Sequence, residues 1–428
     1  MIMPTVEPAL TNRVAFPIDA VRARFPALAV TDAGVARAYF DAPGGTQACA
    51  DAIAAMASHL SEGTANAGGA FATSIATDRM SRAAHEAMAD LLGADPDDIA
   101  FGANMTSLTL AVSRALARDW QPGDEIVVTR LDHDANVAPW LLAAEDRGVR
   151  VRWLDFDPAT GRLDLAALPA LLGERTRLVA VGGASNALGT LNDIPAIAAV
   201  VRAHSPALLF VDAVQSVPHV AVDVATLGCD LLACSPYKFF GPHLGVLWGR
   251  AEILAGLTAY KVRPAASGPS AVRFETGTPS FEAQAGVRAT IDYLAWLGGQ
   301  VGEGAEAPRR ARLLAAMDAC AAYERLLGER LLAGLGRIDG VRLYGPSTMD
   351  ERVPTFAFTV AGVEPRAVVE QLASRGIFAW SGHFYAVETI AALGLGERGG
   401  LVRVGLCHYN DAVEVDRLLD ALAEIARA

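Results

Sequence analysis

The chain lacks the features that would place it outside the cell or in a membrane. Its five cysteines are scattered and form no Cys-x-x-Cys pair, which predicts reduced thiols rather than disulfides. No apolar run is long enough for a membrane span. The first residues, MIMPTVEPALTNR, lack the basic and apolar regions of a signal peptide. We therefore expect a cytoplasmic protein with no membrane partner.

Basic residues are also scarce. The chain has 36 Lys and Arg against 48 Asp and Glu, a net charge of −12. Nucleic acids bind basic surfaces, so we expect no nucleic-acid partner. A P-loop, a Gly-x-Gly-x-x-Gly after a strand and a metal-spaced His/Cys cluster are all missing, which argues against these nucleotide and metal sites.

What is present is a long, apolar chain with a regular alternation of patterns. Its 428 residues are 52% hydrophobic, enough for two or three domains. From about residue 50 to 250, runs such as EIVV, RLVAV and LLFVDA alternate with Ala- and Leu-rich stretches, which predicts an α/β fold with a mostly parallel sheet. Gly298 to Ala307 is Gly- and Glu-rich and predicts a boundary loop. Helical and strand patterns mix after it, which predicts a smaller α+β domain.

Three polar features follow predicted strands, where such sheets bind ligands. They are Asp212 after ALLFV, Lys238 after LLAC, and Thr106 with Ser107 at the start of a helix. Taken singly, each has a plain explanation: a turn or cap carboxylate, a surface lysine and a helix N-cap. Together they fit pyridoxal phosphate, which needs a lysine for its Schiff base, a carboxylate at its ring nitrogen and a phosphate cup.

These segments resemble the class V aminotransferase family, a fold type I group of pyridoxal-phosphate enzymes that includes cysteine desulfurases, selenocysteine lyases, isopenicillin-N-epimerase-like proteins and kynureninase. The resemblance runs from about Phe40 to Leu419. It implies a large cofactor-binding domain with a mostly parallel seven-stranded sheet at residues 41–297, a small α+β domain at 298–428, and an arm at 1–40 that joins the small domain.

The resemblance also assigns residues to the cofactor ring. In DAVQSVPHVAVDV, Asp212 would pair with the ring nitrogen and Gln215 with the ring hydroxyl. In SPYKFFGPHLG, Lys238 would form the Schiff base, and Tyr237 stands where the family usually has histidine. In LDHDANVAPW, His133 would stack on the ring; the alternative is a hydrogen-bonded loop histidine.

Further motifs imply the phosphate site. Met105 and Thr106 fall in the family's phosphate-binding loop, where Asn104 replaces a glycine, and Ser235 falls on a phosphate-binding serine. RFETGTPS resembles a segment that reaches in from a second subunit, with Thr278 on the phosphate. This implies a homodimer with shared active sites.

Two motifs imply the substrate site. ASNALGT places Asn186 near the substrate and the ring hydroxyl, and LVRVGLCHYN makes Arg403 the residue that binds the substrate carboxylate. A surface ion pair is the alternative explanation of Arg403. Cys407 follows the apolar run Val404–Leu406, which favours a core position over a role as nucleophile.

The segment GIFAWSGHFYAVETI departs from the pattern. It resembles GIxxRxGHHCAxP of group II cysteine desulfurases: Gly382 and His383 align, and His383 is a candidate substrate contact. Tyr385 replaces the persulfide cysteine and Trp380 the arginine, and a phenol cannot form a persulfide. Trp380, Phe384 and Tyr385 indicate either a bulkier, more apolar substrate or simple packing. Tyr385 is also a candidate proton donor.

Three hypotheses remain open at this stage. The first is a lyase that acts on an amino acid by β-elimination with carbon–sulfur cleavage, in which Lys238 removes the α-proton. The second is an aminotransferase or an amino-acid epimerase. The third is a non-catalytic relative, against which the joint presence of Lys238, Asp212, Gln215 and His133 argues.

Overall fold

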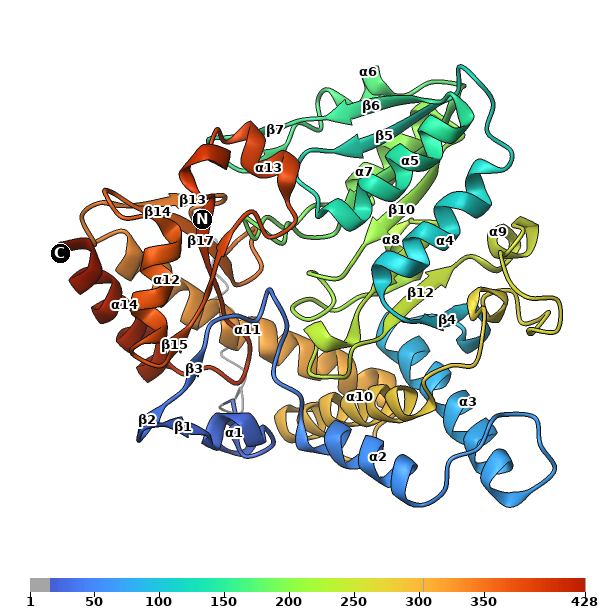
Figure 1. Ribbon diagram of the computed structural model, residues 1–428, viewed down its shortest axis with the longest axis horizontal. Coiled ribbons are helices and arrows are strands. Elements are labelled where there is room, and N and C mark those ends of the chain that lie inside the picture. Colours follow the sequence, from blue (N-terminus) through green and yellow to red (C-terminus); the bar gives the residue numbers. More distant parts are fainter. Residues whose placement is uncertain (1–15, 303, 428) are drawn as a thin grey trace, which may run out of the picture.

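A seven-stranded sheet forms the centre of the molecule (Figure 1). The computed structural model describes residues 16–302 and 304–427. β12 runs antiparallel to both its neighbours, and the other pairings are parallel, which confirms the predicted sheet. In spatial order the strands are β4 (Ile99–Gly102), β12 (Gly245–Gly249), β11 (Leu231–Cys234), β10 (Leu208–Asp212), β9 (Thr176–Gly182), β5 (Glu125–Thr129) and β6 (Arg150–Leu154).

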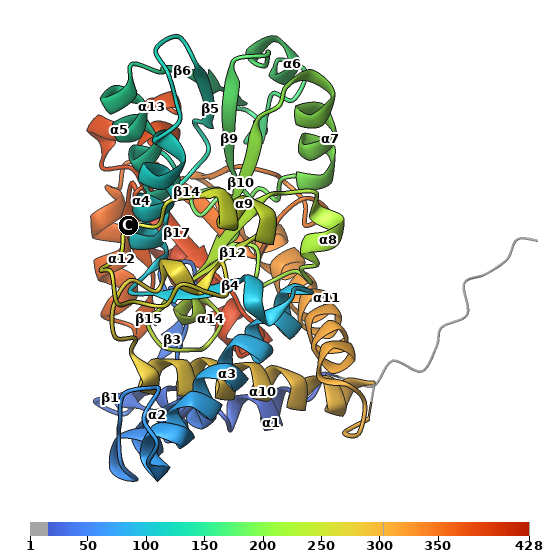
Figure 2. The same cartoon turned by 90° about the vertical axis from the view of Figure 1, so that its right-hand side faces the viewer.

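Helices cover both faces of this sheet (Figure 2). On one face, Ile126, Leu178 and Phe210 pack with α4 (Met105–Ala117) and α5 (Ala138–Arg147). On the other, Val127, Val179 and Leu209 pack in a core with residues of α3 (Ala72–Leu92), α7 (Ile194–His204) and α10 (Phe281–Val301). Successive strand residues point to opposite faces, so burial on both faces explains why the strands are continuous apolar runs.

A second sheet of four antiparallel strands lies in the C-terminal part. Its order is β13 (Val341–Tyr344), β14 (Thr355–Val360), β17 (Leu401–Gly405) and β16 (Trp380–Gly382). It shares a core with α11 (Arg309–Leu335), α12 (Pro365–Ala373) and α14 (Ala412–Arg427). This is the expected smaller α+β part of the fold. Helix α13 (Val387–Ala392) follows β16 and lies beside the large sheet (Figure 1), where Thr389 Oγ1 donates to Arg130 O.

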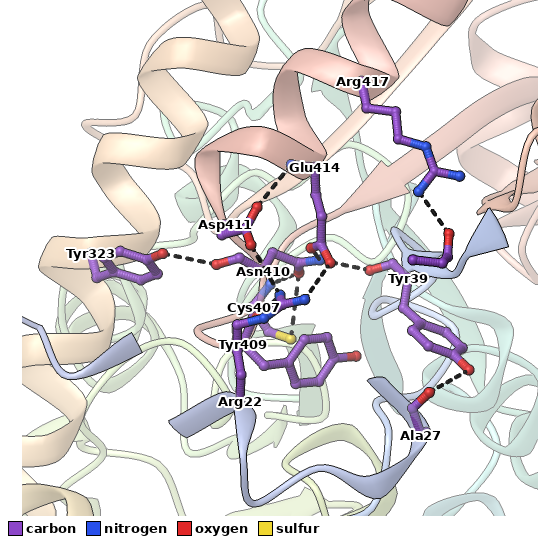
Figure 3. Close-up of polar contacts among 11 residues, drawn as sticks. Arg22, Ala27, Tyr39, Tyr323, Cys407, Tyr409, Asn410, Asp411, Glu414 and Arg417 are labelled. Atoms are coloured by element: carbon purple, nitrogen blue, oxygen red, sulfur yellow. Dashed lines mark hydrogen bonds and ion pairs between the residues drawn. The ribbon is translucent and has the colours of Figure 1, made fainter. Parts of the chain in front are cut away.

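The N-terminal segment is bound to this C-terminal part. β3 (Ala38–Tyr39) pairs with β15 (Ile377–Phe378). In Figure 3, Arg22 at the end of α1 (Ile18–Arg22) donates to Tyr409 O and Glu414, and Asn410 Nδ2 donates to Tyr39 O. Asp41 forms a further parallel bridge with Gly405 at the end of β17. Predicted residues 1–15 of the arm lie outside the described residues.

The remaining elements are short or peripheral. They are α2 (Ala50–Ser61), α6 (Leu168–Leu171), α8 (Val224–Leu227), α9 (Ala251–Gly256), β1 (Thr31–Asp32), β2 (Val35–Ala36), β7 (Phe156–Asp157) and β8 (Arg162–Leu163). Over the described ranges, no helix has both the length and the hydropathy needed to cross a bilayer.

The boundary loop predicted to begin at Gly298 is wrong at its start. Helix α10 continues to Val301, and Gly298 packs directly against the backbone of Arg312 in α11, where a Cβ atom would clash. A glycine at this position permits close approach of two helices rather than a turn.

Candidate active site

A cavity of about 760 Å³ lies between the carboxyl ends of the large-sheet strands and the small domain. Most predicted site residues line it or a narrower extension of about 80 Å³. The larger part is lined by Pro43, Gly44, Thr106, Leu110, His133, Asp134, Ala135, Ala138, Pro139, Leu142, Asn186, Tyr237, Lys238, Trp380, Ser381, Gly382, His383, Phe384, Tyr385 and Arg403. This is the edge where parallel sheets present ligand sites.

Lys238 lies at the centre of the cavity. It ends the 3₁₀ turn Pro236–Lys238, four residues after Cys234 at the end of β11, and is 8% exposed. Its Nζ donates to Pro43 O and lies 4.9 Å from the centre of the Tyr237 ring. Burial, and secondarily the charge of Arg403, lowers the pKa of this amine to about 7. A substantial fraction is therefore neutral, and nucleophilic, near neutral pH.

Asp212 faces the same space as Lys238. It ends β10, is 7% exposed, and lines the narrow extension together with Lys238. Its Oδ1 accepts from Val214 N at 2.9 Å. Burial raises the pKa of the carboxyl to about 6, against the opposing effects of that hydrogen bond and of Lys238. The structure therefore brings together the carboxylate and the amine that the sequence hypothesis requires.

Two buried oxygen atoms in the narrow extension have no hydrogen-bond partner in the described structure. They are Asn186 Oδ1 and Gln215 Oε1. The Gln215 amide nitrogen donates to Thr355 Oγ1 at 3.0 Å, which links the site to β14. Because unpartnered buried acceptors are costly, these oxygens fit a ligand hydroxyl. Together with Asp212 and Lys238, they fit the ring of pyridoxal phosphate.

His133 forms one wall of both cavities. Its Nδ1 accepts from Ala135 N at 3.0 Å, so a neutral ring carries its proton on Nε2. Burial, with Lys238 and Arg403 nearby, lowers the pKa of His133 to about 4. The imidazole is therefore neutral at physiological pH, and it presents a flat aromatic face that can stack on another ring.

The start of α4 closes the cofactor end of the cavity. Asn104 is the N-cap and its side chain accepts from Ser107 N at 2.8 Å. Met105, Thr106 and Ser235 line the narrow extension beside it. Free backbone amides at a helix start, next to hydroxyl groups, suit a phosphate. Asn104, which replaces the glycine of the family pattern, therefore caps this helix.

Arg403 is buried without a carboxylate partner. Its side chain is 4% exposed, and within the described residues Nη1 donates to Asn186 O at 2.8 Å while Nε has no partner. One face of the guanidinium lies 4.2 Å from the centre of the Phe384 ring. Burial lowers its pKa to about 9, so the group is charged at neutral pH. A buried cation of this kind needs an anionic ligand. The alternative explanation, a surface ion pair, is wrong, because Arg403 is buried and forms no ion pair with another described residue.

The segment between β16 and α13 completes the cavity from the small domain. Phe384 and Tyr385 both have positive φ angles, 54° and 58°, which is costly for residues with bulky side chains. The conformation is held by Asn186 Nδ2 donating to Phe384 O at 2.8 Å and Asp134 N donating to Tyr385 O at 2.7 Å. His383 Nδ1 accepts from Tyr385 N at 3.1 Å.

Tyr385 lies at the mouth of the cavity with 66% of its surface exposed. All five cysteines lie within the described residues; each is buried, and none lines this cavity. Cys407 is fully buried in the contact between the N-terminal segment and the small domain (Figure 3), and burial raises its thiol pKa well above the usual value. It is therefore a core residue, as the sequence favours.

One predicted residue lies apart from the rest. Thr278 is exposed on a separate cavity of about 450 Å³ that it shares with Ser107. Within one subunit it does not reach the Lys238 cavity. Its predicted contact with the phosphate in a second subunit's site stays a prediction.

The structure adds residues that sequence reasoning missed. Pro43 and Gly44 line the cavity through their backbone, and only the turn-rich DAPGGTQ signalled them. Asp132 is buried beside His133, where Gly182 N and Asn136 Nδ2 donate to its two oxygens at 2.8 and 2.9 Å. It ties the loop after β5 to the end of β9 and so positions His133.

Comparisons with known proteins identify the family. A model of the class V aminotransferase family matches residues 38–418. An aminotransferase-like protein of Gibberella zeae is 34% identical, with 95% of this chain and 98% of the relative covered. A cysteine desulfurase of Dickeya dadantii is also 34% identical, with 96% and 97% covered.

A solved structure shows the same fold. The apo structure of a cysteine desulfurase from Thermococcus onnurineus NA1 superposes with a TM-score of 0.84 at 26% identity, covering 97% of this chain and 99% of that one. The fold type I architecture, the pyridoxal phosphate requirement and the enzyme class predicted from the sequence are confirmed. The chain belongs to the class V aminotransferase family of pyridoxal-phosphate-dependent enzymes.

Proposed function

We propose that this enzyme is a lyase that acts on a single amino acid and releases the substituent on its β-carbon, without a persulfide cysteine. The supporting observation is that the buried cations Lys238 and Arg403 share one cavity that none of the five cysteines lines. The similarity to cysteine desulfurases supports the carbon–sulfur bond as the one that is cleaved.

Arg403 is the proposed site of the substrate carboxylate. Its Nε and the fork of guanidinium donors match a carboxylate in two parallel hydrogen bonds, and the described residues supply no competing anion at Nε. Asn186 holds the arginine through its carbonyl oxygen and holds the Phe384 carbonyl through its side chain. Together they fix the orientation of the amino acid, and His383 at the rim is a further proposed contact.

The residues of the inner cavity are the proposed cofactor contacts. Asp212 would hold a proton on the ring nitrogen, Gln215 would accept from the ring hydroxyl, and His133 would stack on the ring. Thr106 and Ser235, with the amide of Met105, would hold the phosphate. Pyridoxal phosphate, when bound, supplies a protonated ring that withdraws electrons from the substrate α-carbon.

Lys238 is the proposed acid–base group. A pKa of about 7 lets it accept the α-proton and return it near neutral pH. His133 cannot take this role as an acid, because its pKa of about 4 leaves it neutral. Tyr385 lines the same cavity, and its hydroxyl is the proposed proton donor to the leaving group.

Product analysis with single amino acids tests the reaction class. The purified enzyme should release a keto acid and ammonium in equal amounts, and Lys238→Ala should abolish both. A pyridoxamine form that needs a keto acid to recover would instead establish an aminotransferase, the activity that the name of the Gibberella zeae relative suggests. Loss of optical rotation without product would establish an epimerase.

We also propose a homodimer in which Thr278 of each subunit binds the phosphate in the other subunit's site. The position of Thr278 away from its own Lys238 cavity supports this. Mixed dimers of Lys238→Ala and Thr278→Ala subunits should contain one intact site per dimer. Cofactor binding no better than in Thr278→Ala dimers would contradict the shared site, and a monomer on gel filtration would contradict the dimer.

A further inference from the structure

We propose that the outer half of the Lys238 cavity binds a bulky apolar group, so that the preferred substrates are α-amino acids with a large apolar or aromatic leaving group on the β-carbon rather than cysteine. This inference rests on the lyase function proposed above and names its substrate class. The argument begins from the two ends of the cavity.

The inner end of the cavity is polar. Two cations, Lys238 and Arg403, would set the position of the amino acid that reacts there. Asp212 and Gln215 lie in the narrow extension, while Lys238 and Arg403 lie where it opens into the larger space. An amino acid with its carboxylate on Arg403 and its α-carbon near Lys238 has its side chain directed into the remaining outer volume. The whole cavity, including the space assigned to the cofactor, has a volume of about 760 Å³, and the residues around its outer part are the ones that such a side chain would contact.

The large-domain wall of this outer volume is aliphatic. Leu110 comes from α4, and Ala138, Pro139 and Leu142 come from α5. Leu142 is 55% exposed at the rim. A ligand that covers apolar surface of this kind is bound more tightly, in proportion to the area removed from water.

The small-domain wall is aromatic. Trp380 is the cross-strand neighbour of Arg403, and its indole lies over Gly44, where an added Cβ would come 2.5 Å from Nε1. Phe384 packs on Arg403, and Tyr385 stands at the mouth. A glycine under the indole and a strained turn under the other two rings fix all three rings around the same space.

The polar groups of the outer cavity are few. Besides the residues already assigned to the cofactor and the carboxylate, the polar side chains that line it include Asp134, Ser381 and His383. A thiol would leave most of the apolar walls in contact with water, whereas an aryl or long alkyl group would cover them. Even one methylene in an apolar pocket changes specificity by about 10-fold or more, so the walls select by size.

The reaction is balanced without an oxidant or a reductant. For an S-substituted cysteine, the α-proton leaves to Lys238, the Cβ–S bond breaks with its electron pair on sulfur, and the thiolate takes a proton. One water molecule is consumed, and the products are the free thiol, pyruvate and ammonium. Lys238, which is buried in the cavity, supplies the proton transfer.

Three probes with the same leaving atom test the inference: L-cysteine, S-methyl-L-cysteine and S-benzyl-L-cysteine. Apparent Kd is measured from the change in the visible absorbance of the purified holoenzyme, and pyruvate and thiol release are measured separately. We expect the Kd of S-benzyl-L-cysteine to be at least about tenfold below that of cysteine. Equal or tighter binding of cysteine would overturn the inference.

The two readouts separate this inference from the proposed lyase. Preference for the benzyl compound without pyruvate would refute the lyase and keep the apolar walls as the binding determinant. Pyruvate from all probes without a preference would keep the lyase and refute the walls. No absorbance change with any probe would refute both.

Matched variants identify the wall residues. Leu142→Ala and Trp380→Ala should each weaken benzyl-probe binding about three- to tenfold more than they weaken cysteine binding. Leu326→Ala, at a 65% exposed leucine on α11 outside the cavity lining, is the control and should change neither. If Leu142→Ala instead altered the oligomeric state with unchanged preference, the side chain would belong to a subunit contact and the assignment would fail.

Discussion

The phenol ring of Tyr385 stacks on the imidazole of His133, with ring centroids 5.5 Å apart and 21° between the planes. The two residues come from different sheets: His133 follows β5 of the large domain, and Tyr385 follows β16 of the small one. The stack therefore joins the two halves of the molecule across the mouth of the cavity. The positive φ of Tyr385 is the local cost of reaching this position.

Two substitutions at Tyr385 distinguish the contribution of its ring to substrate binding from that of its hydroxyl. Tyr385→Ala removes the stack, worth about 0.5–1.5 kcal/mol for an aromatic pair, and we expect amino-acid binding to weaken about two- to tenfold. Tyr385→Phe keeps the ring and should bind amino acids like the parent enzyme. Titration of the visible absorbance measures both. A phenylalanine variant as weak as the alanine variant would show that the hydroxyl, not the ring, closes the cavity.

The same pair of variants examines proton donation. If the Tyr385 hydroxyl protonates the leaving group, Tyr385→Phe should lower kcat about 10²-fold or more with Kd unchanged. The effect should shrink for a probe whose leaving thiol has a low pKa, because such a group departs without a proton. An undiminished effect across a series of leaving groups would count against proton donation.

The rate at which Lys238 reacts with the cofactor should depend on pH, with a midpoint far below the pKa of an ordinary lysine. Only the neutral amine is nucleophilic, and burial, followed by Arg403, lowers its pKa to about 7. The rate at which the apoprotein regains its visible band with added pyridoxal phosphate should therefore rise with pH and level off above about pH 7. Stopped-flow absorbance between pH 5.5 and 10 gives the midpoint.

The charge of Arg403 provides the control for this pH dependence. Arg403→Gln removes a like charge and should move the midpoint upward. Lys238→Ala should give no band at any pH. A midpoint that stays near 10.5, or one that Arg403→Gln moves downward, would contradict the assigned cause.

Sequence patterns predicted the fold because burial on both faces of the sheet leaves strands that are continuous apolar runs, such as LLFVD in β10. They predicted Asp212 and Lys238 because both follow such strands directly. Arg403 was identified by its motif alone. Its burial and lack of a carboxylate partner in the described structure depend on where the small domain packs.

Other parts of the site carry no side-chain signal. Pro43 contributes a carbonyl oxygen, and Gly44 contributes the space under Trp380. Neither contribution can be predicted from the type of residue. Gly298 shows the reverse error, because a glycine in a Gly-rich run suggested a loop although it packs between two helices. Long-range contacts decide these cases, and a single sequence does not contain them.

Arg403 should determine the affinity for the substrate carboxylate. Hydrogen bonds to charged groups are worth about 1.5–3 kcal/mol, so we expect Arg403→Gln to weaken amino-acid binding about 10- to 150-fold. Arg403→Lys should recover only part of it, because an ammonium lacks the planar fork. The matched control is the corresponding amine without a carboxylate, whose Kd should hardly change. Equal losses for the amino acid and the amine would indicate a damaged cavity rather than a lost ion pair.

Glu324 and His219 form a buried pair away from the reacting groups. His219 follows β10, and its Nδ1 is hydrogen-bonded to Glu324 Oε2 at 2.9 Å; Glu324 lies in the middle of α11. Their side chains are 5% and 1% exposed. Removing one partner leaves the buried polar atom of the other without a hydrogen bond, which costs about 1–3 kcal/mol. Glu324→Ala should therefore lower the free energy of urea unfolding by about that amount.

An exposed ion pair supplies the control for Glu324. Asp416 pairs with Arg330, and both side chains are about half exposed, so Asp416→Ala should cost less than about 1 kcal/mol. The Glu324 carboxyl has a raised pKa because of burial. The folded-state pKa therefore lies above the unfolded-state pKa. The stability that the protonated carboxyl contributes is fully present below the unfolded-state pKa and is lost as pH rises through the folded-state pKa. Glu324→Gln cannot ionise, so its stability should improve relative to the parent as pH rises above about 4.5. If the parent instead became more stable relative to Glu324→Gln as pH rises, the Glu324–His219 pair would be stabilised as an ion pair.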